Sequence, residues 1–255
     1  MVDCGQDQRL HSGYRIMQAY GSVPLRDGNT SADSVSRFRF PVLGTVKPQQ
    51  RRNGGSGKKM FQTTIRILAV LHPDKDIEAW FEDEARLGLK PTMRRQWTKK
   101  GARPIAPSNT RYQWLYTYAF VHPTDGKSFW LLLPTVNATV VSIALREFVA
   151  AVDPGNKKML LLVIDQAGFH IAGDLVVPDN VILRYLPSHT PELQPVESVW
   201  PLLREATHNR RFVELTDLQE KLIHRCVYLM DHPDVVYGRI GFSWACCTVK
   251  RECIS

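Results

Sequence analysis

Three acidic residues lie where the chain is expected to enter or leave regular elements. Asp83 lies late in an aromatic-rich strand, and Asp165 directly follows the apolar run 160–164. Glu197 lies in the first turn of a helix expected to begin near Pro195. Carboxylate oxygens are the ligands that Mg²⁺ and Mn²⁺ prefer. Three of them at one site could hold two ions about 4 Å apart, which is the spacing that clamps the attacking and leaving oxygens of a phosphodiester.

Each of these acids also has an ordinary structural explanation. A carboxylate that follows a strand is often a helix cap or part of a solvated turn. The hypothesis of a metal site therefore depends on all three acids meeting in the fold.

The apolar pattern predicts an α/β protein that could bring them together. A helix is expected after Asn137, which is a good N-cap, and another at a capping box from Thr216 to Gln219. Strands are expected at 77–89, 111–121, 128–134, 159–164 and 181–186, the second and third forming a hairpin. The unbroken apolar run in the fourth strand is typical of a strand covered on both faces. A central sheet flanked by helices would place Asp165 at the carboxyl end of a strand, where ligands bind in open α/β sheets.

The charge of the chain favours a polyanionic partner. It contains 33 Lys and Arg against 25 Asp and Glu, a formal net charge of +8. This sign is typical of nucleic-acid-binding proteins, although a protein can be basic without such a partner. The densest basic cluster consists of Lys90, Arg94, Arg95, Lys99, Lys100 and Arg103, with no acid among them. It could contact DNA phosphates without reading sequence, or it could be a solvated basic hairpin.

Composition divides the 255 residues into three expected parts. Residues 1–60 lack a lasting apolar period and are predicted to be an irregular arm and linker, residues 61–244 a globular domain, and residues 245–255 a C-terminal tail. No apolar run approaches the roughly 20 residues of a membrane helix, and the start lacks a signal-peptide pattern. We therefore expect a cytoplasmic, nucleoid-associated protein with no membrane partner. The odd number of cysteines, five, indicates reduced thiols.

Three separated segments resemble one family of enzymes. Residues 186–203 (LPSHTPELQPVESVWPLL) resemble the third catalytic block of bacterial insertion-sequence transposases of the IS630 family, within the Tc1/mariner superfamily. Residues 80–89 (WFEDEARLGL) resemble the first block and residues 163–170 (VIDQAGFH) the second, with the connecting WTKKG at 97–101. The blocks occur in the family's order, and the resemblance runs from about residue 60 to about residue 244.

The resemblance implies an RNase H-like fold and a triad of two aspartates and a glutamate, the places of which are taken by Asp83, Asp165 and Glu197. Because Glu82 and Glu84 flank the first acid, its register rests on the family pattern. The implied cofactors are two Mg²⁺ or Mn²⁺ ions. The implied partners are double-stranded DNA, as transposon ends and target, and a second copy of the chain in the DNA complex. The expected activity is metal-dependent strand cleavage at transposon ends followed by strand transfer.

Two other functions remain open at this point. Residues 1–60 show no two-helix pattern of the kind that forms the DNA-binding modules of this family. The chain could therefore be a non-catalytic DNA-binding remnant of a decayed insertion sequence, or a general RNase H-like nuclease. His170 and His189 lie within the second and third blocks, and we expect both to be structural and not catalytic.

Overall fold

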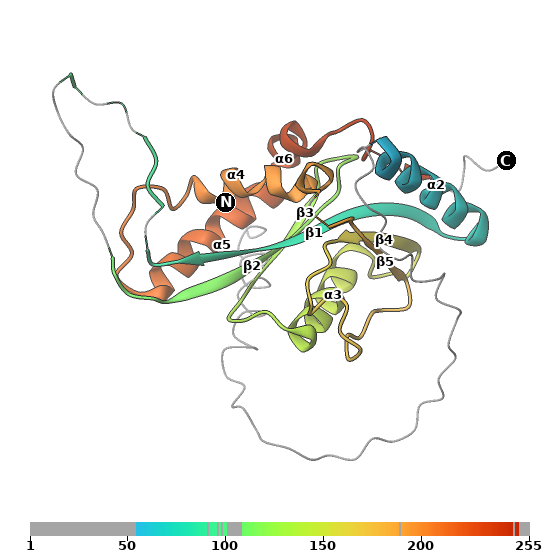
Figure 1. Cartoon of the computed structure of the whole chain (residues 1–255), viewed down its shortest axis with the longest axis horizontal. Coiled ribbons are helices and arrows are strands. Elements are labelled where there is room, and N and C mark those ends of the chain that lie inside the picture. The colour runs from blue at the N-terminus through green and yellow to red at the C-terminus, as the bar shows by residue number, and fades with distance from the viewer. Residues whose placement is uncertain are drawn as a thin grey trace, which may run out of the picture. The chain divides into compact units, whose positions relative to one another are not determined.

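A central mixed sheet has the strand order β3–β2–β1–β4–β5 (Figure 1). The strands are β1 (Asp76–Gly88), β2 (Trp114–Val121), β3 (Ser128–Leu133), β4 (Lys158–Ile164) and β5 (Val181–Tyr185). Strands β1, β2 and β3 are antiparallel neighbours, whereas β4 and β5 run parallel to β1. This computed structural model describes residues 55–90, 92–95, 97, 99–100, 109–188, 190–246 and 248–249, all within the unit Gly54–Ser255.

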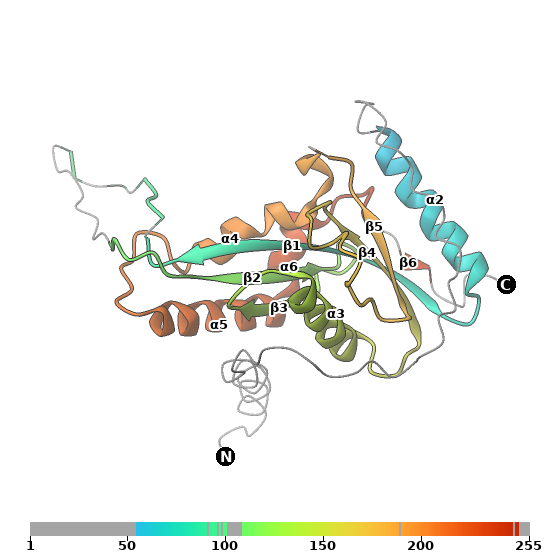
Figure 2. The same cartoon turned by 60° about the horizontal axis from the view of Figure 1, so that its bottom comes forward.

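Five α-helices accompany the sheet in the part of the chain that the structure describes. They are α2 (Gly55–Leu71), α3 (Ala138–Val152), α4 (Trp200–Arg204), α5 (Leu215–Asp231) and α6 (Pro233–Ile240). Helix α3 lies on the opposite side of the strands from α4 (Figures 1 and 2). The fold is therefore the predicted α/β architecture, a central mixed sheet flanked by helices in an RNase H-like arrangement. None of the described helices is long and apolar enough to cross a membrane.

Strand β1 is buried on both faces because helices cover both. Successive side chains of the strand point to opposite sides and so contact different helices. On one face, the Trp80 ring lies 5.1 Å from the ring of Phe148 in α3. On the other face, the Phe81 ring lies 5.5 Å from that of Phe61 in α2. Every residue from Leu160 to Ile164 of β4 is also buried. This confirms the prediction of a strand covered on both sides.

The two predicted helix starts have different outcomes. Asn137 caps α3 as expected, and its Oδ1 accepts a hydrogen bond from the Val140 amide at 2.9 Å. The capping box at Thr216 is wrong, because Glu214 is the N-cap of α5 and Asp217 its reciprocal partner. The Asp217 carboxylate reaches back to the Glu214 amide at 3.1 Å, which moves the helix start two residues towards the N-terminus.

Both predicted ends of the globular domain also need correction. Helix α2 begins at Gly55, so residues 55–60 are helical and do not belong to an irregular arm. At the other end, Ala245 is fully buried, and β6 (Thr248–Val249) pairs antiparallel with β1. These residues are part of the packed domain and not of a tail. Residues 1–54 and 250–255 lie outside the described part of the chain.

The turn between β2 and β3 is closely packed and charged. Gly126 has a φ of 75°, and a Cβ atom at this position would lie 2.0 Å from the Pro233 carbonyl oxygen at the start of α6. Asp125 contacts His122 Nδ1 at 2.7 Å and Lys127 Nζ at 2.7 Å. Partial burial raises the pKa of Asp125, but the hydrogen bonds of His122 and Lys127 outweigh this and hold the pKa below its usual value.

Candidate functional site

Asp83 in β1 and Asp165, just after β4, lie at equivalent positions relative to the pairing of the two strands. Strands β1 and β4 pair in parallel as far as Phe81 and Val163, and the two aspartates each lie two residues further along. Asp165 is the first residue after β4 and has a side chain that is 53% exposed.

Two hydrogen bonds fasten the third segment to β1 beside Asp83. The Gln194 amide Nε2 donates to the carbonyl oxygen of Glu82 at 2.8 Å. The indole Nε1 of Trp200 donates to Oδ2 of Asp83 at 3.0 Å. The 3-10 turn Pro195–Ser198, which carries Glu197, lies between these two anchors.

The expected helix from Pro195 is in fact two short pieces, the 3-10 turn and α4. Pro201 has no amide hydrogen and cannot donate to the carbonyl of Glu197, so a continuous α-helix is interrupted at this point. Glu197 itself is exposed to solvent.

The charge of Glu197 affects the pKa of Asp83. Burial raises the pKa of Asp83, the hydrogen bond from Trp200 lowers it, and the charges of Glu197 and Glu84 raise it further, to about 7. A cation bound next to Asp83 and Glu197 would favour the charged form of Asp83. Asp83 is thus near enough to Glu197 to be affected by its charge, whereas Asp165 follows β4 and its side chain contacts His170.

Asp165 is held by a residue to which the sequence analysis gave no catalytic part. Its Oδ1 lies 2.8 Å from His170 Nδ1 and accepts the Ala167 amide at 2.9 Å. The other ring nitrogen, His170 Nε2, lies 3.1 Å from Oε1 of Glu84 and 3.5 Å from Oε2 of Glu82. The spacing of five residues between Asp165 and His170 was visible in the second block, but only the fold shows the acids on the other side of the ring.

Both partners of this contact have shifted pKa values. The hydrogen bond from His170 is the main cause that lowers the pKa of Asp165. Burial lowers the pKa of His170, but its hydrogen bonds to Asp165 and Glu84 and the charge of Glu82 raise it to about 10. Burial and the charge of Glu84 raise the pKa of Glu82 well above its usual value. The imidazole of His170 thus lies between the carboxyl group of Asp165 on one side and those of Glu84 and Glu82 on the other.

Glu82, Glu84 and His170 form a group that could hold a metal ion. Each offers one ligand atom, and the three atoms lie within 4.8 Å of one another. Glu82 and Glu84 point to the opposite face of β1 from Asp83, because side chains alternate along a strand. This group therefore lies on the other face of β1 from Asp83, and Asp165 contacts it through His170.

The predicted basic segment is exposed, and Asn209 fixes its first part. The side chain of Asn209 accepts from the Arg94 amide at 2.9 Å and donates to the Arg94 carbonyl at 3.1 Å. The Asn209 amide also donates to the Thr92 carbonyl at 3.1 Å. Exposed side chains in this segment are Lys90, Arg94, Arg95, Lys99 and Lys100, whereas Arg103 lies outside the described residues.

A basic groove that the sequence analysis missed adjoins this segment. It has a volume of about 480 Å³. Its described lining includes no acid and five cations: Arg86, Lys90, Arg111, Arg204 and Arg210. The exposed ring of Trp114 lies there too, 5.1 Å from the Arg86 guanidinium. These residues come from three separate segments, 86–90, 111–114 and 204–210, so no local run of charge marks the groove in the sequence.

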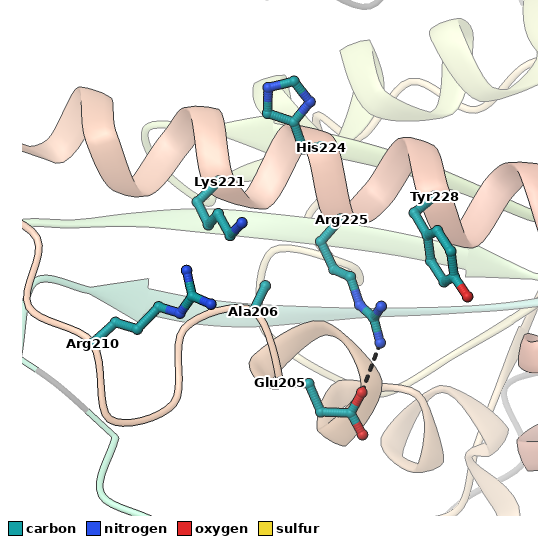
Figure 3. A pocket seen from close by; sticks show the side chains of 7 residues that line it. All are labelled: Glu205, Ala206, Arg210, Lys221, His224, Arg225 and Tyr228. Carbon is teal, nitrogen blue, oxygen red and sulfur yellow. Dashed lines mark hydrogen bonds and ion pairs between the residues drawn. The ribbon is translucent and has the colours of Figure 1, made fainter.

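Arg210 also lines a second depression, between α5 and the loop after α4 (Figure 3). Lys221, His224 and Arg225 of α5 add further basic groups there. The guanidinium of Arg225 bonds Oε2 of Glu205 at 2.7 Å, the contact drawn in Figure 3. Positive charge thus continues from the groove onto α5.

Comparisons with known proteins add a family to this geometry. Residues 78–219 match the DDE superfamily endonuclease family. The uncharacterized protein y4pE/y4sA of Sinorhizobium fredii (strain NBRC 101917 / NGR234) is 38% identical over 124 residues, which span 47% of this chain and 88% of that protein.

Solved structures with similar folds include two of the Mos1 transposase. The paired-end complex with left transposon end has a TM-score of 0.46 at 14% identity, over 80% of this chain and 67% of that one. The mariner paired end complex with Mn has a TM-score of 0.46 at 16% identity, over 80% and 68% of the two chains.

The family match spans more than half of the chain, from β1 into α5, and includes Asp83, Asp165 and Glu197. The chain therefore belongs to the DDE superfamily endonucleases.

Proposed function

We propose that this chain is the catalytic domain of an insertion-sequence transposase of the IS630 type, with Asp83, Asp165 and Glu197 as its catalytic carboxylates. One observation supports the proposal: Asp83 and Asp165 each lie two residues past the last β1–β4 pair, and Gln194 and Trp200, which flank the turn that carries Glu197, bond β1 at Glu82 and Asp83. These acids come from three segments that are remote in sequence.

The three residues fit a site for Mg²⁺ or Mn²⁺. All the donors are carboxylate oxygens, which both ions prefer. Asp165 and Glu197 are exposed and can be reached from solvent. Burial, and then the charges of Glu197 and Glu84, raise the pKa of Asp83 to about 7. Two bound ions would activate the attacking water and stabilise the leaving oxygen of a phosphodiester.

The protein side of the mechanism is positioning. Asp83, Asp165 and Glu197 would hold the ions, and Trp200 fixes the orientation of the Asp83 carboxylate through its indole. Hydrolysis would break a P–O3′ bond at a transposon end and leave a 3′-OH and a 5′-phosphate. That 3′-OH would then attack a phosphodiester of the target, forming one new P–O bond and releasing one target 3′-oxygen.

The basic surface is the proposed contact for double-stranded DNA, with two copies of the chain in the DNA complex. The exposed segment held by Asn209 and the groove with five cations both lie at the far end of β1 from Asp76, the end towards which Asp83 lies. Contacts of this type would orient the duplex and make binding salt-dependent, without specifying sequence.

A cleavage and joining assay tests the proposal. End-labelled duplexes from the DNA that flanks the gene are incubated with the protein, Mg²⁺ and a supercoiled target plasmid. We expect a nicked strand and a product joined to the plasmid. Asp165→Asn should abolish both because the amide loses the charge that binds a cation. The matched change Asp174→Asn, at an exposed loop aspartate, should leave both products unchanged.

The same assay separates the two alternatives. Cleavage with no joined product would favour a general nuclease. Duplex binding with no cleavage by the parent protein would favour the non-catalytic remnant.

A further inference from the structure

We propose that His170 is a positioning residue for Asp165. Its Nδ1 hydrogen-bonds the Asp165 carboxylate and orients it, while Glu84 and Glu82 hold the other ring nitrogen, Nε2. The inference rests on the proposed function, because it assigns a task to a residue that supports one of the proposed metal ligands. It also assigns a role to Glu82 and Glu84, the two acids beside Asp83 that are not among the proposed catalytic carboxylates.

Asp165 needs such support because it lies beyond the end of its strand. Its side chain is 53% exposed, whereas that of His170 is 1% exposed. Both hydrogen bonds to the carboxylate, from His170 and from the Ala167 amide, go to Oδ1. This arrangement fixes the plane of the carboxylate, and among the described residues it leaves Oδ2 with no protein donor, available to an ion.

Both the backbone and the ring of His170 are held by neighbouring residues. The Tyr185 hydroxyl donates to the His170 carbonyl at 2.9 Å, and the His170 amide donates to the Ala167 carbonyl at 2.9 Å. The ring contacts Phe169 edge-on, with the ring centroids 4.6 Å apart. A ring that is held this firmly can transmit a fixed orientation to Asp165.

Glu82 and Glu84 determine which way the ring faces. Glu82 is 2% exposed, and the Glu84 side chain is 8% exposed. A buried carboxylate needs a nearby donor or positive charge, and His170 Nε2 is within 3.5 Å of both. Each ring nitrogen therefore faces a carboxylate oxygen, Nδ1 that of Asp165 and Nε2 that of Glu84.

Two substitutions of His170 distinguish its two contacts. The amide nitrogen of an asparagine falls near the place of Nδ1, and that of a glutamine falls near the place of Nε2. His170→Asn therefore keeps a donor for Asp165 and loses the one for Glu84, whereas His170→Gln does the reverse. Both remove the same charge, so a difference between them reports the contact with Asp165.

The measurement is Mn²⁺ binding by calorimetry on the full chain, together with the melting temperature of each variant. Removal of a residue that orients a metal ligand commonly lowers metal affinity about 10–100-fold. We expect a loss of at least about 10-fold in His170→Gln and of no more than about 3-fold in His170→Asn. In an Asp165→Asn background, the difference between the two should disappear.

The outcomes separate this inference from the proposed function. If the parent protein binds Mn²⁺ through Asp165 but the two variants bind it equally well, His170 does not position Asp165. If His170→Asn loses an ion that His170→Gln retains, Nε2 is a ligand in the Glu82–Glu84–His170 group, and the inference is overturned. If Asp165→Asn binds Mn²⁺ as tightly as the parent, it is the proposed function that fails.

Either variant could fail to fold, because each leaves buried acids without a cation. The comparison is then made in a Glu82→Gln, Glu84→Gln background, which has no buried charge at these positions to neutralise. The same order of affinities, Asn above Gln, is expected there, and equal affinities would again overturn the inference.

Discussion

Gln194 is the residue on which the attachment of the third segment to the sheet most depends. It is 6% exposed, and its amide donates to the Glu82 carbonyl at 2.8 Å, one residue beyond the last β1–β4 pair. Gln194→Met keeps the length of the side chain but removes the donor. The Glu82 carbonyl would then be left without this bond next to Asp83.

The expected cost follows from the burial of that bond. A buried carbonyl that loses its donor costs about 1–3 kcal/mol. Part of this is offset because Gln194 Oε1, which is buried and has no hydrogen-bond partner among the described residues, is removed as well. We therefore expect a loss of about 1–2 kcal/mol in the free energy of unfolding. For a domain of this size, the melting temperature should fall by roughly 2–8 °C.

The chain contains a matched control. Gln166 makes the same kind of bond, from its amide to the Leu186 carbonyl at 2.7 Å, but on the surface. Gln166→Met should cost less than about 0.5 kcal/mol, because water can replace the lost bond. Chemical denaturation of both variants gives the comparison. Equal stabilities of the two variants would refute the view that the Gln194 bond holds the third segment on β1.

Three further predictions concern the turn and the basic surface. Gly126→Ala should destabilise the protein by more than about 1–2 kcal/mol, because the left-handed backbone alone costs this much and the clash at α6 adds to it. The control is Gly173→Ala, which has open space around it and should have little effect in thermal melts. The pKa of Asp125 is lower in the folded than in the unfolded protein, so its carboxylate stabilises the fold above the unfolded pKa, near 4, and this stabilisation is lost as the pH falls below that value. The stability difference between the parent and Asp125→Asn should therefore shrink from pH 6 to pH 3 in denaturant titrations. Loss of four cations should flatten the plot of log DNA affinity against log salt by roughly 2–4 units for all duplexes alike, and an unchanged slope would show that the segment is only a solvated face. The four changes to alanine are at Arg94, Arg95, Lys99 and Lys100.

Much of the fold could be predicted from local patterns. The apolar run that became β4 and the N-cap at Asn137 are both properties of a few adjacent residues, and both predictions were confirmed. Helix α2 was missed because its first residues, from Gly55, are glycine, serine and lysine and resemble a linker. The start of α5 was misplaced because Thr216 with Gln219 and Glu214 with Asp217 both have the spacing of a capping box, and the second pair forms it.

The surroundings of the site could not be predicted in the same way. Their contacts join residues that are remote in sequence, such as the 112 residues between Glu82 and Gln194 or the 86 between Glu84 and His170. The alternation of β1 separates Asp83 from its two acidic neighbours, but only the packed fold shows that Trp200 meets the first and His170 the others. The basic groove is likewise assembled from scattered arginines.

The central claim is that Asp83, Asp165 and Glu197 together bind the divalent ions of a DNA-cleaving site. The most direct test is a crystal structure of the protein grown with Mn²⁺, with the ions located by their anomalous scattering. We predict anomalous density between these three carboxylates, within about 2.5 Å of their oxygens. Density confined to the group of Glu82, Glu84 and His170, or no density beside Asp83 at saturating Mn²⁺, would contradict the claim.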